Sequence, residues 1–375
     1  MNKTKVTKGM GRRALLACLA LGTVLVLGLR APVAATAAGK SGPIMTLVKL
    51  LEVGRPVAYE ALTIVPIYRA DNPRPGDFVM LDEAVKNGWI EIGELEGGRV
   101  PQVRISNLSK RTIYIMGGEI LTGARQDRLL ATDLLLAPGT RNLVAPVYCV
   151  EHGRWTAVSP NFTTKNNIGT YDLRAKAAGK GDSAQAEIWS SVAEQNVRVG
   201  VASPTGAYQD AYEAEGNKRK IQAIEEKMSA IPRLMHDTVG VVIALGGRIV
   251  SADIFADPAL FQKQWPKILR SSALSAIGHQ GLGKLDQTVA ADFLKKLLDK
   301  DYQDKKGLDL GTEYSCLDDD VTVQALALDG AVIHLASFVQ EGARKKVIET
   351  EGPEQRIRVI RDEPSLYHQA VISIR

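Results

Sequence analysis

The residues best suited to chemistry lie in two short segments of the chain. The first, residues 117–128, contains Glu119 followed by a run of polar side chains, and the second, residues 149–155, contains Glu151 followed by more. Carboxylates can act as general acids or bases, and arginine forks bind phosphate or carboxylate groups in bidentate fashion. The two segments therefore predict either a polar ligand site or a structural network of ion pairs.

Strand-like alternation precedes each glutamate. In residues 113–119 and again in residues 145–151, every second side chain is apolar or small, so each apolar face would end in a carboxylate. A carboxylate on such a face needs a partner, because leaving it unpaired is costly. The nearest candidates in the sequence are Arg125, Arg128 and Arg154.

Two interpretations of these segments stay open. In the structural one, buried ion pairs lock the end of a sheet. In the functional one, Glu119 and Glu151 are the catalytic acid and base, and a ligand is bound by Arg125, Gln126, Asp127, Arg128, Arg154 and Trp155. A nucleophilic pair of Cys149 and His152 is disfavoured, because on a regular strand the two side chains point to opposite faces. The sequence does not decide whether the protein is an enzyme.

Familiar catalytic and cofactor motifs are absent. The chain has no HExxH, GxSxG, phosphate-loop or dinucleotide-binding pattern. Its five histidines are scattered without metal-ligand spacing, and the acidic run 318–320 is typical of a solvated turn before a strand. We therefore predict no metal site, and the sequence identifies no cofactor.

The first 38 residues have the order of a cleavable signal peptide. Basic residues come first, the 16-residue apolar run 14–29 follows, and small residues 31–38 come last. The run is shorter than the roughly 20 residues of a membrane-spanning helix. We expect a secreted or periplasmic protein with no stable membrane span after the leader is removed.

Removal of the leader changes the charge of the chain. The whole chain has 47 basic and 42 acidic residues, and six of the basic ones but none of the acidic ones lie in residues 1–38. The remainder therefore has 41 basic and 42 acidic residues. A nearly neutral chain lacks the basic footprint of a nucleic-acid-binding protein.

Two cysteines remain after removal of the leader, Cys149 and Cys316, and we expect at least one of them to be buried.

Residues 40–158 predict a β-rich half. Strands are expected over residues 62–68, 89–94, 100–106, 112–121, 129–136 and 142–151, separated by glycine, proline and asparagine turn signals. A short helix over residues 82–87 would have Asp82 as its N-cap. Such spacing favours an antiparallel sheet, sandwich or barrel. Residues 159–181 are poor in apolar side chains and predict a surface loop or linker.

Residues 182–340 predict an α+β half of the same domain. Helices are expected over residues 182–199, 207–228 and 286–298, and another begins at Asp257, a good N-cap before Pro258. Two hairpins pair residues 241–245 with 248–254 and residues 321–328 with 331–338. A charged tail, residues 341–375, follows. The expected fold class is α+β, with an antiparallel β-rich N-terminal half packed against a helix-and-hairpin C-terminal half.

Several ordered segments resemble one protein family. They are Gly118-Glu119 with residues 123–128, residues 146–155, residues 240–255, and residues 260–261 with 265–271. In these segments the chain is similar to the ARG and rhodanese-phosphatase-superfamily-associated protein domain over roughly residues 45–340. The family's name records an association with ADP-ribosylglycohydrolases and rhodanese-phosphatase proteins. The resemblance therefore implies a context of ADP-ribose or phosphate chemistry, without a defined reaction.

Two functions follow from these observations. The first is an exported ligand-binding or interaction module whose partner is a small anionic ligand or another protein. The alternative is a hydrolase that acts on a phosphate-, ADP-ribose- or sugar-containing substrate, with Glu119 and Glu151 as acid and base. Convergence of these glutamates and the arginines on an open cleft would favour a site, whereas a closed cluster would favour a structural role.

Overall fold

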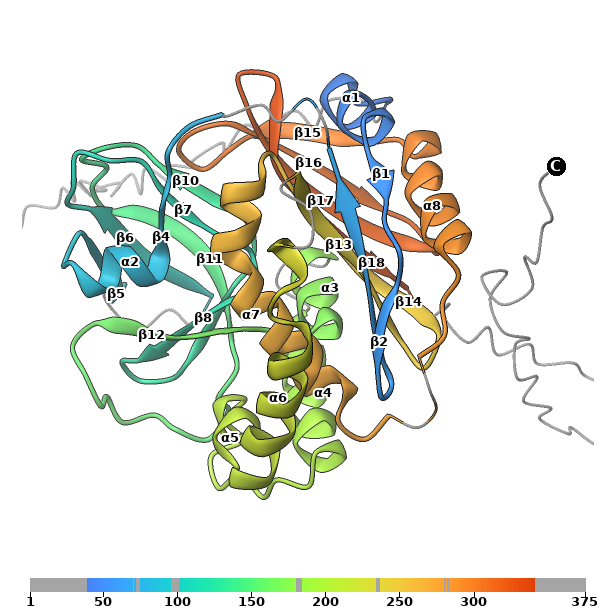
Figure 1. Cartoon of the computed structure of the whole chain (residues 1–375). Coiled ribbons are helices and arrows are strands. Elements are labelled where there is room, and N and C mark those ends of the chain that lie inside the picture. Colours follow the sequence, from blue (N-terminus) through green and yellow to red (C-terminus); the bar gives the residue numbers. More distant parts are fainter. Residues whose placement is uncertain are drawn as a thin grey trace, which may run out of the picture. The chain divides into compact units, whose positions relative to one another are not determined.

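A computed structural model describes residues 39–69, 71, 75–95, 101–179, 184–233, 237–279, 281 and 283–340. The expected leader (1–38) and charged tail (341–375) lie outside these residues. The described part is an α+β fold with three β-sheets (Figure 1). Its strands pair in antiparallel fashion, except that β4 (Val79–Met80) runs parallel to β7 (Ile113–Ile115). The predicted fold class is confirmed.

The largest sheet has nine strands and joins both ends of the described chain. Both predicted hairpins lie in it, because their apolar strands can be buried on two faces. In spatial order its strands are β1 (Glu52–Val53), β3 (Leu62–Tyr68), β13 (Thr238–Leu245), β14 (Arg248–Phe255), β18 (Ala331–Val339), β17 (Val321–Leu328), β16 (Thr312–Leu317) and β15 (Gln303–Lys306), with β2 (Val57–Tyr59) paired to β3.

Helices cover both faces of this sheet. On one face lie α7 (Pro258–Ala276) and α3 (Tyr171–Gly179), and on the other lie α1 (Gly42–Lys49) and α8 (Gln287–Lys296), which is followed by the 3-10 turn η3 (Leu297–Asp299) (Figure 1). The α7 helix begins as predicted, since the Asp257 side chain accepts the N–H of Leu260 at 3.0 Å. It continues through Pro266 without a break.

The remaining helices extend the layer around α7. They are α4 (Ala184–Arg198), α5 (Gln209–Glu213), α6 (Glu215–Met228) and the 3-10 turn η2 (Ile231–Arg233). The helix predicted over residues 207–228 is therefore two helices, α5 and α6, which meet at Ala214, where the backbone is extended. None of the helices among the described residues is long and apolar enough to span a membrane.

Two smaller sheets form the rest of the β-rich part. The six-stranded sheet has the order β12 (Phe162–Ile168), β8 (Glu119–Gly123), β9 (Arg128–Leu130), β11 (Leu143–Cys149), β6 (Gln102–Asn107) and β5 (Ile90–Glu94). The three-stranded sheet has the order β10 (Leu134–Leu136), β7 and β4. Both contribute side chains to one hydrophobic core, together with the short helix α2 (Leu81–Lys86). The sheets thus form a compact sandwich-like unit.

The structure corrects several details of the predicted N-terminal half. The segment 40–68 does not belong to the β-rich unit, because β3 pairs with β13 and so completes the large sheet. The strand expected over residues 112–121 is broken at Gly117-Gly118 into β7 and β8, and that expected over 129–136 is divided into β9 and β10. Asp82 lies within α2 rather than capping it, since Met80 is the N-cap.

Residues 159–181 are not the expected loop or linker. They contain the strand β12, which pairs with β8, and the helix α3. Neither element has a strong apolar pattern: β12 is rich in polar residues, and α3 buries only Leu173, Arg174 and Ala177. Tertiary pairing therefore orders a segment whose local pattern indicated no regular structure.

Both cysteines that follow the expected leader are buried and unpaired. Cys149 is fully buried at the end of β11, and Cys316 is 7% exposed on β16. Burial also raises the pKa of the Cys316 thiol. Their placement agrees with the expectation that at least one thiol would be buried.

Candidate functional site

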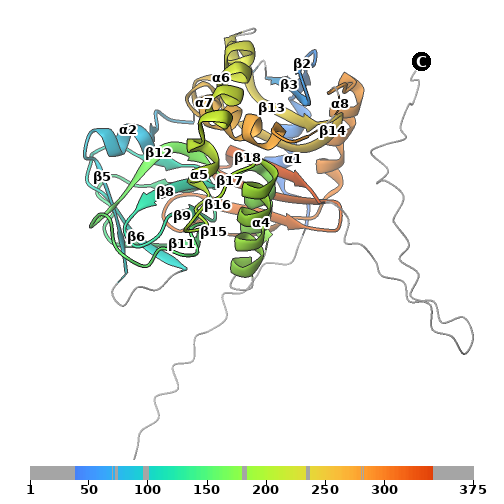
Figure 2. The same ribbon diagram turned by 90° about the horizontal axis from the view of Figure 1, so that it is seen from below.

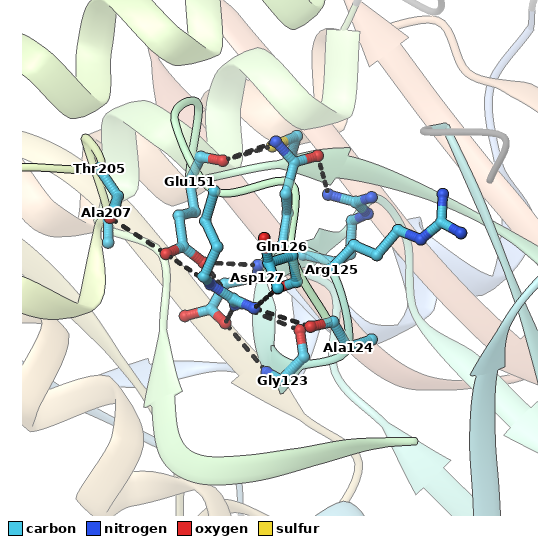
Figure 3. A network of polar contacts seen from close by, with 12 residues as sticks. Gly123, Ala124, Arg125, Gln126, Asp127, Glu151, Thr205 and Ala207 are labelled. Carbon is cyan, nitrogen blue, oxygen red and sulfur yellow. Dashed lines mark hydrogen bonds and ion pairs between the residues drawn. The ribbon is translucent and has the colours of Figure 1, made fainter. Parts of the chain in front are cut away.

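Glu151 and Arg154 are the centre of a network of ion pairs and hydrogen bonds, which we call the Glu151–Arg154 network (Figure 3). Arg154 Nε donates to Glu151 Oε1 at 2.8 Å, and Arg154 Nη2 lies 2.6 Å from Oε2, so the pair is bidentate. The other donors of Arg154 bond to the carbonyls of Gly123, Ala124 and Thr156 and to the Asp127 carboxylate. All of its nitrogens are thereby engaged.

The turn between β8 and β9 is built around the same carboxylates. Gly123 has a φ of +110°, which residues with a Cβ rarely adopt, and Ala124 follows at a φ of 46°. The N–H of Asp127 donates to Glu151 Oε2 at 3.1 Å, and the N–H of Gly123 donates to Asp127 Oδ1 at 3.0 Å. Glu151 thus helps to hold the backbone of this turn in a strained conformation.

Gln126 and Arg128 extend the Glu151–Arg154 network into the interior. Gln126 Nε2 donates to the carbonyl of Glu151 at 3.0 Å, and Arg128 Nη1 donates to Gln126 Oε1 at 3.1 Å. Both side chains are buried. Burial raises the pKa of Asp127 to about 6, and the charge of Glu151 adds to the shift. These groups bond to one another within the network.

Two predicted ligand-binding side chains lie apart from this network. Trp155 is 62% exposed. The side chain of Arg125 is 53% exposed and extends away from Glu151 (Figure 3), with its Nε 3.4 Å from Glu94 Oε2. Neither residue joins the other predicted site residues around a common space.

Glu119 lies in a different cluster of charges. Lys267 of α7 donates to both carboxylate oxygens of Glu119, at 2.8 and 3.0 Å, and its Nζ is also 3.0 Å from Asp82 Oδ1. Glu119 is fully buried and Lys267 is 3% exposed. The partner of Glu119 is therefore a lysine 148 residues away along the chain, and not one of the three arginines near it in sequence.

The two predicted acid–base glutamates thus belong to separate, closed clusters. Glu151 is only 5% exposed, and the arginine that pairs with it has no free donor. Such a geometry favours the structural interpretation, in which ion pairs fix the ends of strands and the turns between them. The assignment of Glu119 and Glu151 as acid and base remains a prediction.

We expect Glu151→Gln and Arg154→Ala to lower the free energy of unfolding by about 1.5–3 kcal/mol each, the range for hydrogen bonds to charged groups. Because the two side chains bond to each other, the double variant should lose less than the sum of the two. Chemical denaturation of the wild type, both single variants and the double variant measures this. Additive losses within ~0.5 kcal/mol would contradict the pairing.

A second buried network, which we call the Asp253 network, consists of Asp133, Arg174, Asp253 and His334. His334 Nδ1 lies 2.7 Å from Asp133 Oδ2, and Nε2 lies 3.1 Å from Asp253 Oδ1. Arg174 donates to both oxygens of Asp253, at 3.0 and 2.6 Å. Since each ring nitrogen faces a carboxylate oxygen, an imidazolium with two N–H donors satisfies both. Phe255 stacks on this ring, with 4.3 Å between the centroids.

In the Asp253 network, the attraction of neighbouring opposite charges shifts the pKa values more strongly than burial does. Burial by itself would lower the pKa of His334, but the charge and hydrogen bonds of Asp133 and Asp253 raise it to about 9. Burial likewise opposes ionisation of Asp253, yet Arg174 and His334 hold the pKa of its carboxyl well below the usual range. The network therefore carries two positive and two negative charges at neutral pH.

The Asp253 network connects the large sheet with its surroundings. Asp253 on β14 and His334 on β18 lie on neighbouring strands, Arg174 comes from α3, and Asp133 comes from the turn between β9 and β10. The break at Gly117-Gly118 makes room for it, because a Cβ on Gly118 would lie 2.6 Å from Arg174 Cγ.

Sequence reasoning missed this network, although one signal was present. Asp253 and His334 each lie among apolar residues of a largely apolar strand, and a charged or titratable residue at such a position indicates a buried, partnered group. Arg174 had no such signal, since it lies in the segment expected to be a loop.

An open cleft of about 220 Å³ lies beside Asp133. Its walls come from the β9–β10 turn, β11, the end of α3 and the strands β15 to β17. The strands β9, β11, β15, β16 and β17 are labelled close together near the centre of Figure 2. Its main polar and aromatic side chains are Asp133, Tyr148, Lys305, Glu313, Tyr314 and Gln324. Asp133 and Gln324 also line a cavity of about 10 Å³ that reaches Arg174 and His334. Asp133 thus belongs to the Asp253 network and also lines the cleft.

Two carboxylates face this cleft in fixed positions. Asp133 Oδ1 accepts the N–H of Gly117 at 2.6 Å, while its other oxygen faces His334. The Glu313 side chain is 10% exposed, and its Oε2 lies 3.0 Å from Lys305 Nζ. Burial raises the pKa of Glu313, and the charge of Asp133 raises it further. Among the residues with described positions, no group of three or more His, Cys, Asp and Glu side chains could hold a metal ion.

The fold and these contacts define an α+β protein in which a buried network of charges adjoins a polar cleft. The family model of the ARG and Rhodanese-Phosphatase-superfamily-associated Protein domain matches residues 50–338, and the chain belongs to that family. The matched range includes both networks and the residues that line the cleft. The searches of curated proteins and of solved structures find no match.

Proposed function

We propose that this protein is an exported domain that binds a small polar ligand in the cleft beside Asp133. The basic, apolar and small-residue order of residues 1–38 supports export to an extracytoplasmic compartment. One observation carries the binding proposal: an open cavity of about 220 Å³ is lined by two largely buried carboxylates that other groups hold in position. Ligand sites typically combine such a concavity with a few fixed polar groups.

The cleft supports this function better than the Glu151–Arg154 network does. The donors of Arg154 are engaged by protein groups, so that network offers no free arginine fork to an anion. A hydrolase that uses Glu119 and Glu151 together has less support, because the two carboxylates lie in separate closed clusters. A second cavity, of about 270 Å³ beside Trp265, is lined by a single carboxylate, Glu225, so the cleft beside Asp133 is better suited to a polar ligand. A docked protein partner, which the sequence left open, stays an alternative.

A variant that fills the cleft tests the proposal. Ala178 lines the cleft near the end of α3, and Ala175 lies one turn earlier on the same helix without lining it. We expect ligand-observed NMR with a defined panel (glucose, ribose, ADP-ribose, inorganic phosphate, 1,4-diaminobutane and acetate) to detect binding of at least one probe to the wild type. Ala178→Trp should abolish that signal, and the matched control Ala175→Trp should keep it.

Two results would count against a binding role for the cleft. One is the absence of binding by every probe to the wild type, and the other is binding that persists unchanged in Ala178→Trp. Circular dichroism and thermal unfolding of both tryptophan variants would establish that the loss reflects a filled cleft rather than a misfolded chain.

A further inference from the structure

The charges around the cleft are buried to very different extents. The Asp253 network is balanced by itself, with Asp133 and Asp253 against Arg174 and His334. The second carboxylate of the cleft, Glu313, has a partner that is mostly in water: the Glu313 side chain is 10% exposed, whereas that of Lys305 is 61% exposed. A pair with one largely solvated partner contributes little to stability.

We propose, on the basis that the cleft is a binding site, that its ligand is an organic ammonium compound, a small primary amine. The amine would take the place of Lys305 beside Glu313 and bring an equally buried positive charge to that carboxylate. Its remaining N–H groups would reach other acceptors of the cleft lining, which include Asp133.

The rest of the lining agrees with a cation. Tyr148 and Tyr314 contribute aromatic rings to the walls, and the faces of such rings attract ammonium groups. An anion would meet two carboxylates, Asp133 and Glu313, with only the exposed Lys305 to attract it. The small anionic ligand expected from the sequence is therefore disfavoured at this cleft.

Three probes of equal length separate the charge classes. They are 1,4-diaminobutane, the neutral 1,4-butanediol and the dianion succinate, each titrated calorimetrically into the full chain at low salt. We expect the diamine to bind and succinate to give no heat of binding. The diol should bind at least tenfold more weakly than the diamine, because charge-assisted hydrogen bonds are about twice as strong as neutral ones.

Variants of the lining make the test specific. Glu313→Gln should weaken diamine binding about tenfold or more, the loss expected for one hydrogen bond between charged groups. Glu91→Gln, at an exposed position on β5, is the matched control and should leave binding unchanged. Lys305→Ala should strengthen diamine binding severalfold, because it removes the cation that competes for Glu313.

Three outcomes would overturn the ammonium proposal: no binding of the diamine, equal binding of the diol, or weaker diamine binding in Lys305→Ala. If Glu313→Gln fails to fold, the Lys305→Ala result still decides, since that side chain is exposed and its removal leaves the core intact. Sugars or phosphate could bind to the wild type and not to Ala178→Trp, while the diamine does not bind at all. In that case the cleft is still a ligand-binding site, and only the proposal that its ligand is an ammonium compound is wrong.

Discussion

Replacing Asp253 with asparagine should lower the free energy of unfolding by about 3–5 kcal/mol, the cost of breaking a buried ion pair. Asp253 is fully buried between Arg174 and His334, so its loss leaves two cations without sufficient negative charge. The total free energy of unfolding of a globular domain is roughly 5–15 kcal/mol, so this loss would be a large part of it. Urea denaturation of the wild type and the variant measures the change.

Matched variants separate this effect from a general sensitivity to losing a carboxylate. Asp292→Asn, in an exposed pair with Lys295 on α8, should change stability by less than ~0.5 kcal/mol. The apolar double variant Arg174→Met/Asp253→Leu should lose less than the sum of its single changes, because it leaves no unpaired arginine. A loss below ~1 kcal/mol in Asp253→Asn would show that the Asp253 network does not bear on stability.

Stability should also fall as the pH rises from about 6.5 to about 9. The pKa of His334 is raised to about 9 in the folded protein, against an ordinary value near 6.5 in the unfolded chain. Below the pKa of the histidine in the unfolded chain, the charged imidazole therefore contributes its full stabilisation. This contribution disappears as the pH rises through the pKa of His334 in the folded protein. The difference between the two pKa values corresponds to about 3 kcal/mol of unfolding free energy.

Denaturation at pH 7, 8 and 9.5 measures this decline. Asp127, whose pKa is raised to about 6, is already ionised over most of this range and contributes little to the slope. His334→Asn should flatten the decline, and NMR titration of the His334 ring in the wild type gives its pKa directly, whether or not the variant folds. A His334 ring that titrates near pH 6.5 would contradict the proposed imidazolium between two carboxylates.

Local sequence patterns were sufficient wherever neighbouring residues decide the structure. The strand β3, both apolar hairpins and the start of α7 lie where predicted, because alternation, a two-residue turn and an aspartate before a proline act over a few residues. Gly117-Gly118 shows where such reasoning failed. The break there depends on the close approach of Arg174, which comes from a helix far along the chain.

The candidate sites show the same division between local and distant contacts. The sequence by itself included Arg154, three residues away, among three candidate partners of Glu151, and the structure pairs the two. It could not identify Lys267 as the partner of Glu119, nor assemble the Asp253 network, whose hydrogen bonds join residues 79 to 201 positions apart. The cleft, with walls from segments as distant as β11 and β17, likewise exists only in the folded chain. A buried charge must find a partner, but packing decides which residue that partner is.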